Sequence, residues 1–152
     1  MLLKFETADG TLRLWQQRGE SYEHVLMKAL GYAMHIEEFP SLEVERGVGL
    51  RYKPDLIAFA SDGSFDFWGE CGLITIRKAV WVAKHSGAKR LTIFKIGHDL
   101  DQLTNQLRQE IEPKYRESGR LRLVNFVRDI RDLTASRQIA KVSTDWYTET
   151  IA

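Results

Sequence analysis

Apolar and polar residues alternate in several short runs of this chain and recur at helical spacing in others, so the pattern predicts a mixture of strands and helices. Residues 1–17 predict an N-terminal hairpin, because Asp9-Gly10 lies between two alternating runs. With those two residues as the loop, Glu6 is expected opposite Arg13. Opposite charges in facing positions stabilise a strand pair.

The same pattern, together with capping and stop residues, predicts four helices and several more strands. The predicted helices run from Ser21 or Gly19 to His35, from Thr75 to Ser86, from Asp99 to Glu112 and over Asp129–Gln138. The predicted strands are a pair within Arg51–Glu70, then Arg90–Ile96, Leu121–Val127 and Val142–Ile151, with loop and a short strand over Glu37–Gly49. The strand, helix and strand across residues 65–96 predict a crossover with parallel pairing.

The central hairpin brings two carboxylates together. Asp62-Gly63 is a strong signal for a two-residue loop. If these residues are the loop, facing positions have numbers that sum to 125, since 62 + 63 = 125, and Asp55 lies opposite Glu70 on one face of the sheet. Like charges in facing positions are destabilising unless a cation lies between them or one of them is protonated. Two oxygen ligands at a strand end suit Mg²⁺ or Mn²⁺.

The composition is that of an ordinary globular domain. The chain has 152 residues, of which 43% are hydrophobic and 28% charged, and we expect a single domain over residues 1–152. The net charge of +1 gives no global signal for nucleic acid, so any such signal must be local. No apolar run approaches a membrane span, and no secretory signal is seen, so we expect a cytoplasmic protein without a membrane partner. Cys71 is the only cysteine, which rules out an internal disulfide.

The order of motifs resembles a known superfamily. Pro54-Asp55, then Glu70 on the partner strand and a helix, is similar to the PD-(D/E)XK nucleases. The run Trp68–Ala79 (W-G-E-C-G-L-I-T-I-R-K-A) resembles the YaeQ branch of that superfamily. This resemblance implies an α/β fold with a restriction-endonuclease-like core over about residues 20–96, a mixed central sheet flanked by helices. The hairpin 1–17 and a C-terminal extension 97–152 would be added to that core.

The chain departs from the superfamily pattern at one position. The superfamily has a lysine two residues after its second acidic residue, and Gly72 stands there. Lys78 is the candidate replacement, because a helix starting at Thr75 would place Arg77 and Lys78 in its first turn. Positive charge there opposes the helix dipole by roughly 0.3–1 kcal/mol, which suggests an anion nearby.

The resemblance implies a metal-dependent phosphodiester hydrolase acting on DNA or RNA, with Mg²⁺ or Mn²⁺ as cofactor. Asp55 and Glu70 would bind the cation together with the backbone carbonyl of Cys71, and Glu20 or Glu23 would reach it through water. Lys78 would orient the nucleophile or stabilise the transition state. Phosphates of the substrate would meet Arg77, Lys78 and Lys84. A wider group of basic residues could follow a nucleic-acid backbone: Arg77, Lys78, Lys84, Lys89, Arg90 and Lys95.

Each of these residues also has an ordinary structural interpretation. Asp55 and Glu70 could be solvated strand ends, Glu20 and Glu23 plain first-turn acids, and Lys78 a surface lysine. Cys71 is expected to be a small core residue, and the four histidines to be structural or exposed: His24, His35, His85 and His98. The tryptophans Trp15, Trp68, Trp81 and Trp146 are expected in the core. The alternative function is a catalytically silent domain that binds nucleic acid or protein. The sequence leaves the oligomeric state open.

Overall fold

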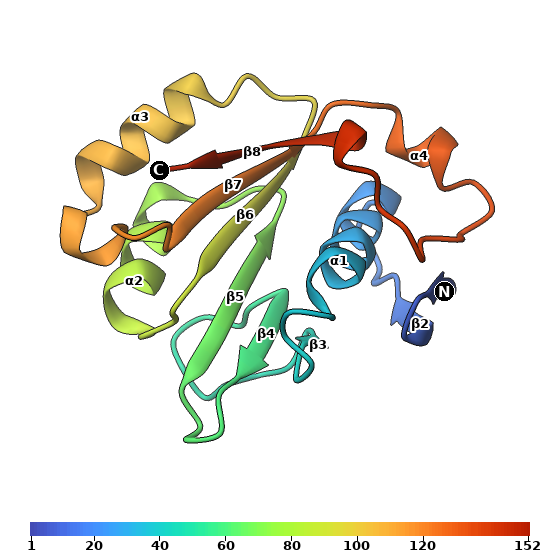
Figure 1. Cartoon of the computed structure of the whole chain (residues 1–152), viewed down its shortest axis with the longest axis horizontal. Coiled ribbons are helices and arrows are strands. Elements are labelled where there is room, and N and C mark those ends of the chain that lie inside the picture. Colours follow the sequence, from blue (N-terminus) through green and yellow to red (C-terminus); the bar gives the residue numbers. More distant parts are fainter.

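The computed structural model describes the chain from Met1 to Ala152, which folds around one six-stranded mixed sheet (Figure 1). The strand order is β3-β4-β5-β6-β7-β8, and β1 and β2 form a separate two-stranded sheet. The strands are β1 (Leu2–Thr7), β2 (Gly10–Trp15), β3 (Glu43–Val44), β4 (Leu56–Phe59), β5 (Phe65–Cys71), β6 (Leu91–Ile96), β7 (Leu121–Phe126) and β8 (Tyr147–Ile151). The mixed central sheet and the N-terminal hairpin agree with the fold class expected from the sequence.

Helices cover both faces of the sheet (Figure 1). They are α1 (Tyr22–His35), α2 (Ile76–His85), α3 (Asp101–Glu110) and the short α4 (Ile130–Leu133), with 3₁₀ turns at Pro113–Tyr115 and Thr144–Trp146. Helix α1 and the β1–β2 hairpin pack on one face of the sheet, and α2 and α3 on the other. No helix of the chain is both long enough and apolar enough to cross a membrane.

Side-chain alternation along the strands divides the core into two layers. Leu56 and Phe67 point toward α1, whereas Ile57 and Trp68 point toward α2. Residues with odd numbers on β4 therefore share a face with residues with even numbers on β5, as the hairpin register predicts. Glu70 follows Trp68 by two positions, which puts its side chain on the α2 face.

The register of the central hairpin is as predicted, but its tip is different. Leu56, Ile57 and Ala58 pair with Gly69, Trp68 and Phe67, so each pair sums to 125. At the tip, the Ala60 N–H donates to the Ser64 carbonyl at 2.7 Å. The loop therefore includes Ser61 as well as Asp62 and Gly63, with Gly63 in a left-handed conformation at φ 85°.

The longer loop and a β-bulge shift the register of this hairpin by one residue in opposite directions. The longer loop displaces the pairing by one residue, so that Phe59 faces Phe65. A bulge between Ala58 and Phe59 then restores the predicted register toward Asp55 and Glu70. The strands therefore keep their predicted register as far as Leu56 and Gly69, although the tip was wrong, and Asp55 lies directly before β4, outside the paired residues.

The register predicted for the N-terminal hairpin is wrong. Glu6 faces Thr11, not Arg13, because the loop is Ala8-Asp9 and Gly10 begins β2. The Thr7 hydroxyl accepts the Asp9 N–H at 3.1 Å and donates to the Gly10 carbonyl at 2.8 Å. These side-chain bonds favour a turn one residue earlier than the Asp-Gly pair alone indicates.

The crossover region agrees with the prediction, and the C-terminal region agrees in part. β5, β6 and β7 are parallel, with α2 and α3 as the crossover helices. The helix expected over Asp129–Gln138 is only the single turn α4, since Thr134 donates from its hydroxyl to the Ile130 carbonyl and ends it. Trp15 is exposed, against the expectation of a core tryptophan, whereas Trp68 is fully buried.

Candidate functional site

Four elements, β4, β5, α1 and α2, meet where β5 ends. β5 carries Glu70 and Cys71, Asp55 lies directly before β4, and α1 and α2 begin nearby. The helix starts are fixed by side chains: the Ser21 hydroxyl accepts the His24 N–H, and the Thr75 hydroxyl accepts the Lys78 N–H, each at 3.1 Å. Of the sequence-predicted site residues, Asp55, Glu70, Cys71 and Lys78 are therefore brought to one end of the sheet.

Glu70 is buried and held on both oxygens. Its side chain is 4% exposed, Oε1 accepts the Trp68 indole N–H at 2.8 Å, and Oε2 accepts from Lys78 Nζ at 2.9 Å. Burial raises the pKa of Glu70, and the nearby charge of Asp55 raises it further, while the bonds from Trp68 and Lys78 oppose the rise. The structure thus places Lys78 at the acid that the sequence assigned to it.

Lys78 reaches Glu70 from the first turn of α2. Its side chain is 22% exposed, and its ammonium lies 5.4 Å from the centre of the Tyr52 ring. The ring face offers a second weak attraction for the cation. No acidic residue occupies the first turn of α2, so Glu70 supplies the compensating negative charge from the neighbouring strand.

Asp55 is tied to the end of β5 and to α1. Its Oδ2 accepts the Cys71 N–H at 2.8 Å and lies 3.6 Å from His24 Nε2, while no hydrogen bond involves its Oδ1. The bond to the Cys71 backbone fixes the Asp55 carboxylate beside the residue that follows Glu70. Cys71 itself is buried, and burial raises the pKa of its thiol well above the usual value, as a core cysteine requires.

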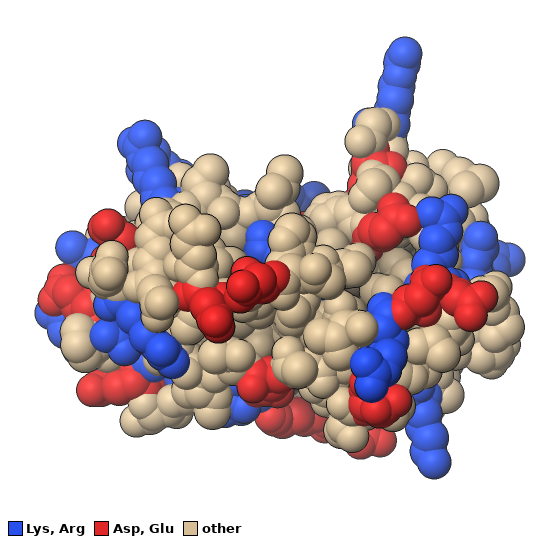
Figure 2. All heavy atoms as spheres, turned by 90° about the horizontal axis from the view of Figure 1, so that it is seen from above, with Lys and Arg blue, Asp and Glu red and all other residues tan.

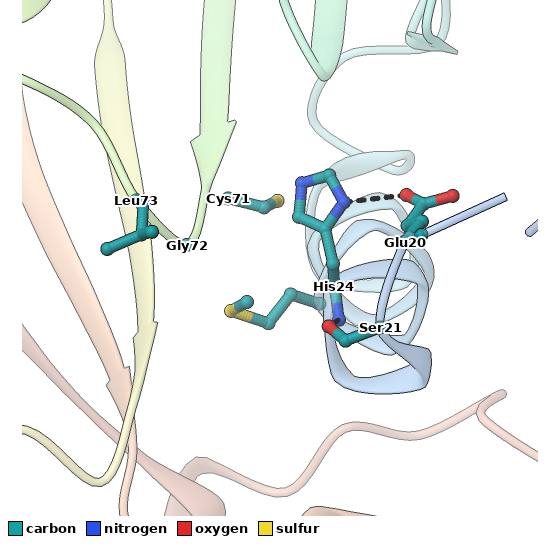
Figure 3. Close-up of a pocket in the computed structure, with 8 residues that line it drawn as sticks. Glu20, Ser21, His24, Cys71, Gly72 and Leu73 are labelled. Carbon is teal, nitrogen blue, oxygen red and sulfur yellow. Dashed lines mark hydrogen bonds and ion pairs between the residues drawn. The ribbon is translucent and has the colours of Figure 1, made fainter. Parts of the chain in front are cut away.

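His24 belongs to the site, although the sequence gave it no role beyond structure. Its Nδ1 lies 2.6 Å from Glu20 Oε2 (Figure 3). Its Nε2 lies 3.6 Å from Asp55 Oδ2, so the ring bridges two carboxylates. Asp55 raises the pKa of His24 most, against burial, and Glu20 adds to the rise. The signal in the sequence was its spacing, since His24 lies one helical turn after Glu20.

Lys28 is a second residue that the sequence analysis missed. It is fully buried on α1, and its ammonium binds Glu20 Oε2 at 2.6 Å and also Glu45. The two carboxylates outweigh burial and raise the pKa of Lys28. Glu45 has φ 56°, rare for a residue with a side chain, and its N–H donates to the Asp55 carbonyl at 2.9 Å. The buried Lys28 thus forms an ionic cluster with Glu20 and the partly exposed Glu45, beside Asp55.

Glu20 and Glu23 have different partners in the structure. Glu20 is linked to Asp55 through His24, whereas Glu23 pairs with Arg131 at 2.6 Å away from these residues. Burial by itself raises the pKa of Glu20, but the bonds from Lys28, the Gln17 backbone and His24 lower it overall. Of the two alternatives left open by the sequence, the geometry favours Glu20.

The remaining basic residues do not form one surface. Arg77 and Lys84 are exposed on α2 without a carboxylate partner. Lys84 lies in the last turn of α2, at the end of the helix away from Lys78 and Glu70, so the structure does not bring it to the site as the sequence predicted. Lys89 and Arg90 lie at the other end of the sheet, where the Lys89 N–H donates to Phe65 at the start of β5. Figure 2 shows one face on which basic and acidic side chains are interspersed. The expectation of a continuous basic track is therefore not met by Lys89 and Arg90.

A pocket opens between the start of α1 and the end of β5 (Figure 3). Its volume is about 400 Å³, and it is lined by residues 19–21, 24, 27 and 71–73. His24 and Glu20 form one wall, and Gly72 and Leu73 the other. Asp55 borders this pocket through its contacts with His24 and Cys71.

Asp55 and Glu70 are the residues near the end of β5 that could hold a metal ion. No group of three or more His, Cys, Asp or Glu side chains is arranged to share one ion, which a structural or catalytic zinc site requires. Magnesium keeps several waters and is usually held by one or two carboxylates together with substrate phosphates. Asp55 and Glu70 could provide carboxylates for such a site: Asp55 Oδ1 accepts no hydrogen bond, whereas both oxygens of Glu70 do. A cation at Glu70 would lie beside the Lys78 ammonium or displace it.

The fold is that of the YaeQ proteins. The chain is similar to a YaeQ protein from Pseudomonas syringae, with a TM-score of 0.64, 16% identity, and coverage of 98% of this chain and 92% of that one. It is also similar to YaeQ from Xanthomonas axonopodis pv. citri, with a TM-score of 0.62, 17% identity, and coverage of 89% and 77%. No protein-family model and no curated protein matches the sequence. At such low identity, the likeness concerns the fold.

Proposed function

We propose that this chain is a metal-dependent nuclease of the PD-(D/E)XK superfamily, with Asp55, Glu70 and Lys78 as its catalytic residues. One observation carries the proposal: the ammonium of Lys78 on α2 lies 2.9 Å from the carboxylate of Glu70 on β5. Lys78 thus provides a lysine beside Glu70, although Gly72 occupies the position where the superfamily has its lysine. An acid, a second acid and a lysine are the charges that metal-assisted phosphodiester hydrolysis uses.

Each residue has a distinct task in this proposal. Asp55 and Glu70 hold Mg²⁺ or Mn²⁺, which when bound would lower the pKa of a ligand water and offset phosphate charge. Lys78 keeps its ammonium beside Glu70 and can donate to a phosphate oxygen, because it is partly exposed. Glu20 acts on Asp55 through His24, in place of the water-mediated metal contact that we expected from the sequence.

A catalytically silent binding domain is the second candidate. The observation that favours it is the saturation of Glu70, since both of its oxygens accept hydrogen bonds from the protein. In such a domain the Lys78–Glu70 pair would only stabilise the start of α2. A cation would then gain little by binding, because it would have to compete with an ammonium already in place.

Metal titration followed by a cleavage assay separates the two candidates. If the nuclease proposal is right, millimolar Mn²⁺ raises the melting temperature of the wild-type protein relative to chelator. A hundredfold excess over Kd corresponds to about 2.7 kcal/mol. Asp55→Asn should abolish that rise. Wild-type protein with Mn²⁺ should also cut at least one substrate from a panel of single- and double-stranded DNA and RNA.

Lys78→Met tests the displaced lysine, with Lys84→Met on the same helix as a matched control. Lys78→Met should abolish cleavage while keeping the Mn²⁺-dependent rise in melting temperature, and Lys84→Met should cut like the wild type. Equal melting temperatures in Mn²⁺ and chelator, together with no cleavage of any substrate, would favour the silent domain.

A further inference from the structure

Lys95 is a buried lysine with no negative partner. It lies on β6, its side chain is 9% exposed, and its Nζ donates to the Gly72 carbonyl at 2.5 Å. No carboxylate lies within 4 Å of the ammonium, so it forms no ion pair. Burial alone lowers the pKa of Lys95. A single neutral carbonyl does not replace the hydration that a buried ammonium has lost.

The lack of a carboxylate partner distinguishes Lys95 from the other buried lysine of the chain. Lys28 and Lys95 are the only buried residues among the lysines and arginines. Lys28 is neutralised by two carboxylates, as buried charges normally are. A buried charge without a counter-ion is costly, and one that faces a ligand site often has its partner in the ligand.

Lys95 is placed at the edge of the candidate site. Strands β5 and β6 are parallel, with Glu70 beside Ile93 and Cys71 beside Phe94, so the next position brings Lys95 level with Gly72. Gly72 follows β5 directly and also lines the pocket. This edge is formed by the carboxyl ends of parallel strands, where ligands of open α/β sheets bind.

The segment that follows Gly72 also lacks internal partners. The backbone N–H groups of Leu73, Ile74 and Thr75 form no hydrogen bond within the chain. The segment leads into the first turn of α2, which carries Arg77 and Lys78 and no acid. Around Gly72, Glu70 is paired with Lys78 and Asp55 accepts the Cys71 N–H, whereas neither carboxylate pairs with Lys95.

We propose that Lys95 binds a phosphodiester group of a nucleic-acid strand, at a position next to the bond that the Asp55–Glu70–Lys78 site would cut. The inference rests on the proposed function for the identity of the ligand. The strand supplies the missing negative charge, and the unpaired N–H groups after Gly72 supply further donors to the same phosphate. Lys95 is thus a substrate-binding residue, distinct from Lys78.

Binding in chelator tests this without relying on cleavage. Fluorescence anisotropy of labelled single-stranded DNA, duplex DNA and RNA would be measured in EDTA across a range of salt concentrations. The variants are Lys95→Met, which keeps the length of the side chain, and Lys89→Met as a control at the opposite end of the sheet. Melting curves show whether each variant is folded.

Lys95→Met should weaken binding about tenfold or more at low salt and reduce the salt slope by about one phosphate contact. Lys89→Met should change neither quantity. A folded Lys95→Met with wild-type affinity, or with weaker binding at an unchanged salt slope, would overturn the inference, because a residue that only supports the loop releases no counter-ions.

The two proposals can fail separately. A wild-type protein that binds nucleic acid through Lys95 but cuts nothing with Mn²⁺ contradicts the nuclease and supports the Lys95 site. A wild-type protein that cuts, with Lys95→Met unchanged in affinity and salt slope, supports the nuclease and contradicts the Lys95 site. A wild-type protein that binds none of the three probes in EDTA contradicts the Lys95 site, and cleavage with Mn²⁺ then decides the nuclease proposal by itself.

Discussion

The two buried lysines of this protein differ in whether the chain provides a counter-charge for the buried ammonium group. Lys28 on α1 is fully buried and lies between Glu20 and Glu45, and its pKa is raised. Lys95 on β6 is nearly as buried, has one backbone carbonyl and no carboxylate, and its pKa is lowered by burial. The first charge is balanced by carboxylates of the chain, whereas the second has no counter-charge within the chain.

The comparison shows that burial alone does not indicate what a charged residue does. A lysine that meets carboxylates in the fold is part of the folded structure, and its removal leaves those carboxylates unpaired. A lysine that meets none lowers stability in the free protein, and such residues are retained where function needs them. Lys78 lies between these cases, because it is partly exposed and has one carboxylate, Glu70.

The largest effect is expected from Lys28→Met. This change leaves Glu20 and Glu45 without their shared cation, so the free energy of unfolding should fall by about 3 kcal/mol. Urea denaturation measures the fall. Adding Glu20→Gln to Lys28→Met should recover part of the loss, because one unpaired charge is then removed. A loss below about 1 kcal/mol would show that the cluster is not a buried ionic unit.

Lys95→Met should have the opposite sign. Replacing an uncompensated ammonium by an apolar chain of similar length should leave the free energy of unfolding unchanged or raise it by about 1 kcal/mol. The pH dependence sharpens the contrast. Because the folded pKa of Lys95 is lowered, its penalty is present below that pKa and is relieved as pH rises toward the unfolded value near 10.4.

Wild-type stability should accordingly gain a contribution as pH rises into that alkaline window, and Lys95→Met should lack it. Melting temperatures across the alkaline range, with Lys89→Met as control, check this point. A Lys95→Met protein as strongly destabilised as Lys28→Met would remove the distinction between the two lysines.

His24 should give a smaller, pH-dependent effect near neutrality. Its folded pKa is raised by Asp55 and Glu20, so its stabilising contribution is fully present below about pH 6.5 and is lost as pH rises through the folded pKa. His24→Asn should flatten this part of the stability profile, and His98→Asn, at an exposed histidine, should not. Profiles of equal slope for His24→Asn and wild type would show that the bridge between Glu20 and Asp55 does not form.

The smallest effect is expected at Glu70. Lys78 opposes the raised pKa of Glu70, so Lys78→Met should raise that pKa further, and Lys84→Met should leave it unchanged. NMR titration of the side-chain carboxyl carbon measures both. A Glu70 pKa that does not respond to Lys78→Met would mean that the ion pair is absent in solution.

Local signals in the sequence were sufficient to predict the alternation of strands and helices, the parallel crossover and the register of the central hairpin up to Leu56 and Gly69. These follow from local periodicity, caps and turn residues, which act over a few neighbouring positions. The sequence also identified Lys78 correctly as a residue near Glu70, because the cap at Thr75 fixes which residues fall in the first turn of α2.

Only the tertiary structure decided which charges meet across the chain. Lys28 and Glu45 are far apart in sequence, and their contact depends on where the loop after β3 lies against α1. Whether Lys95 has a carboxylate partner likewise depends on all the elements packed around it, so the sequence pattern could not predict that it has none. Local spacing could not assign His24 to Asp55, because that contact needs the packing of α1 against the end of the central hairpin.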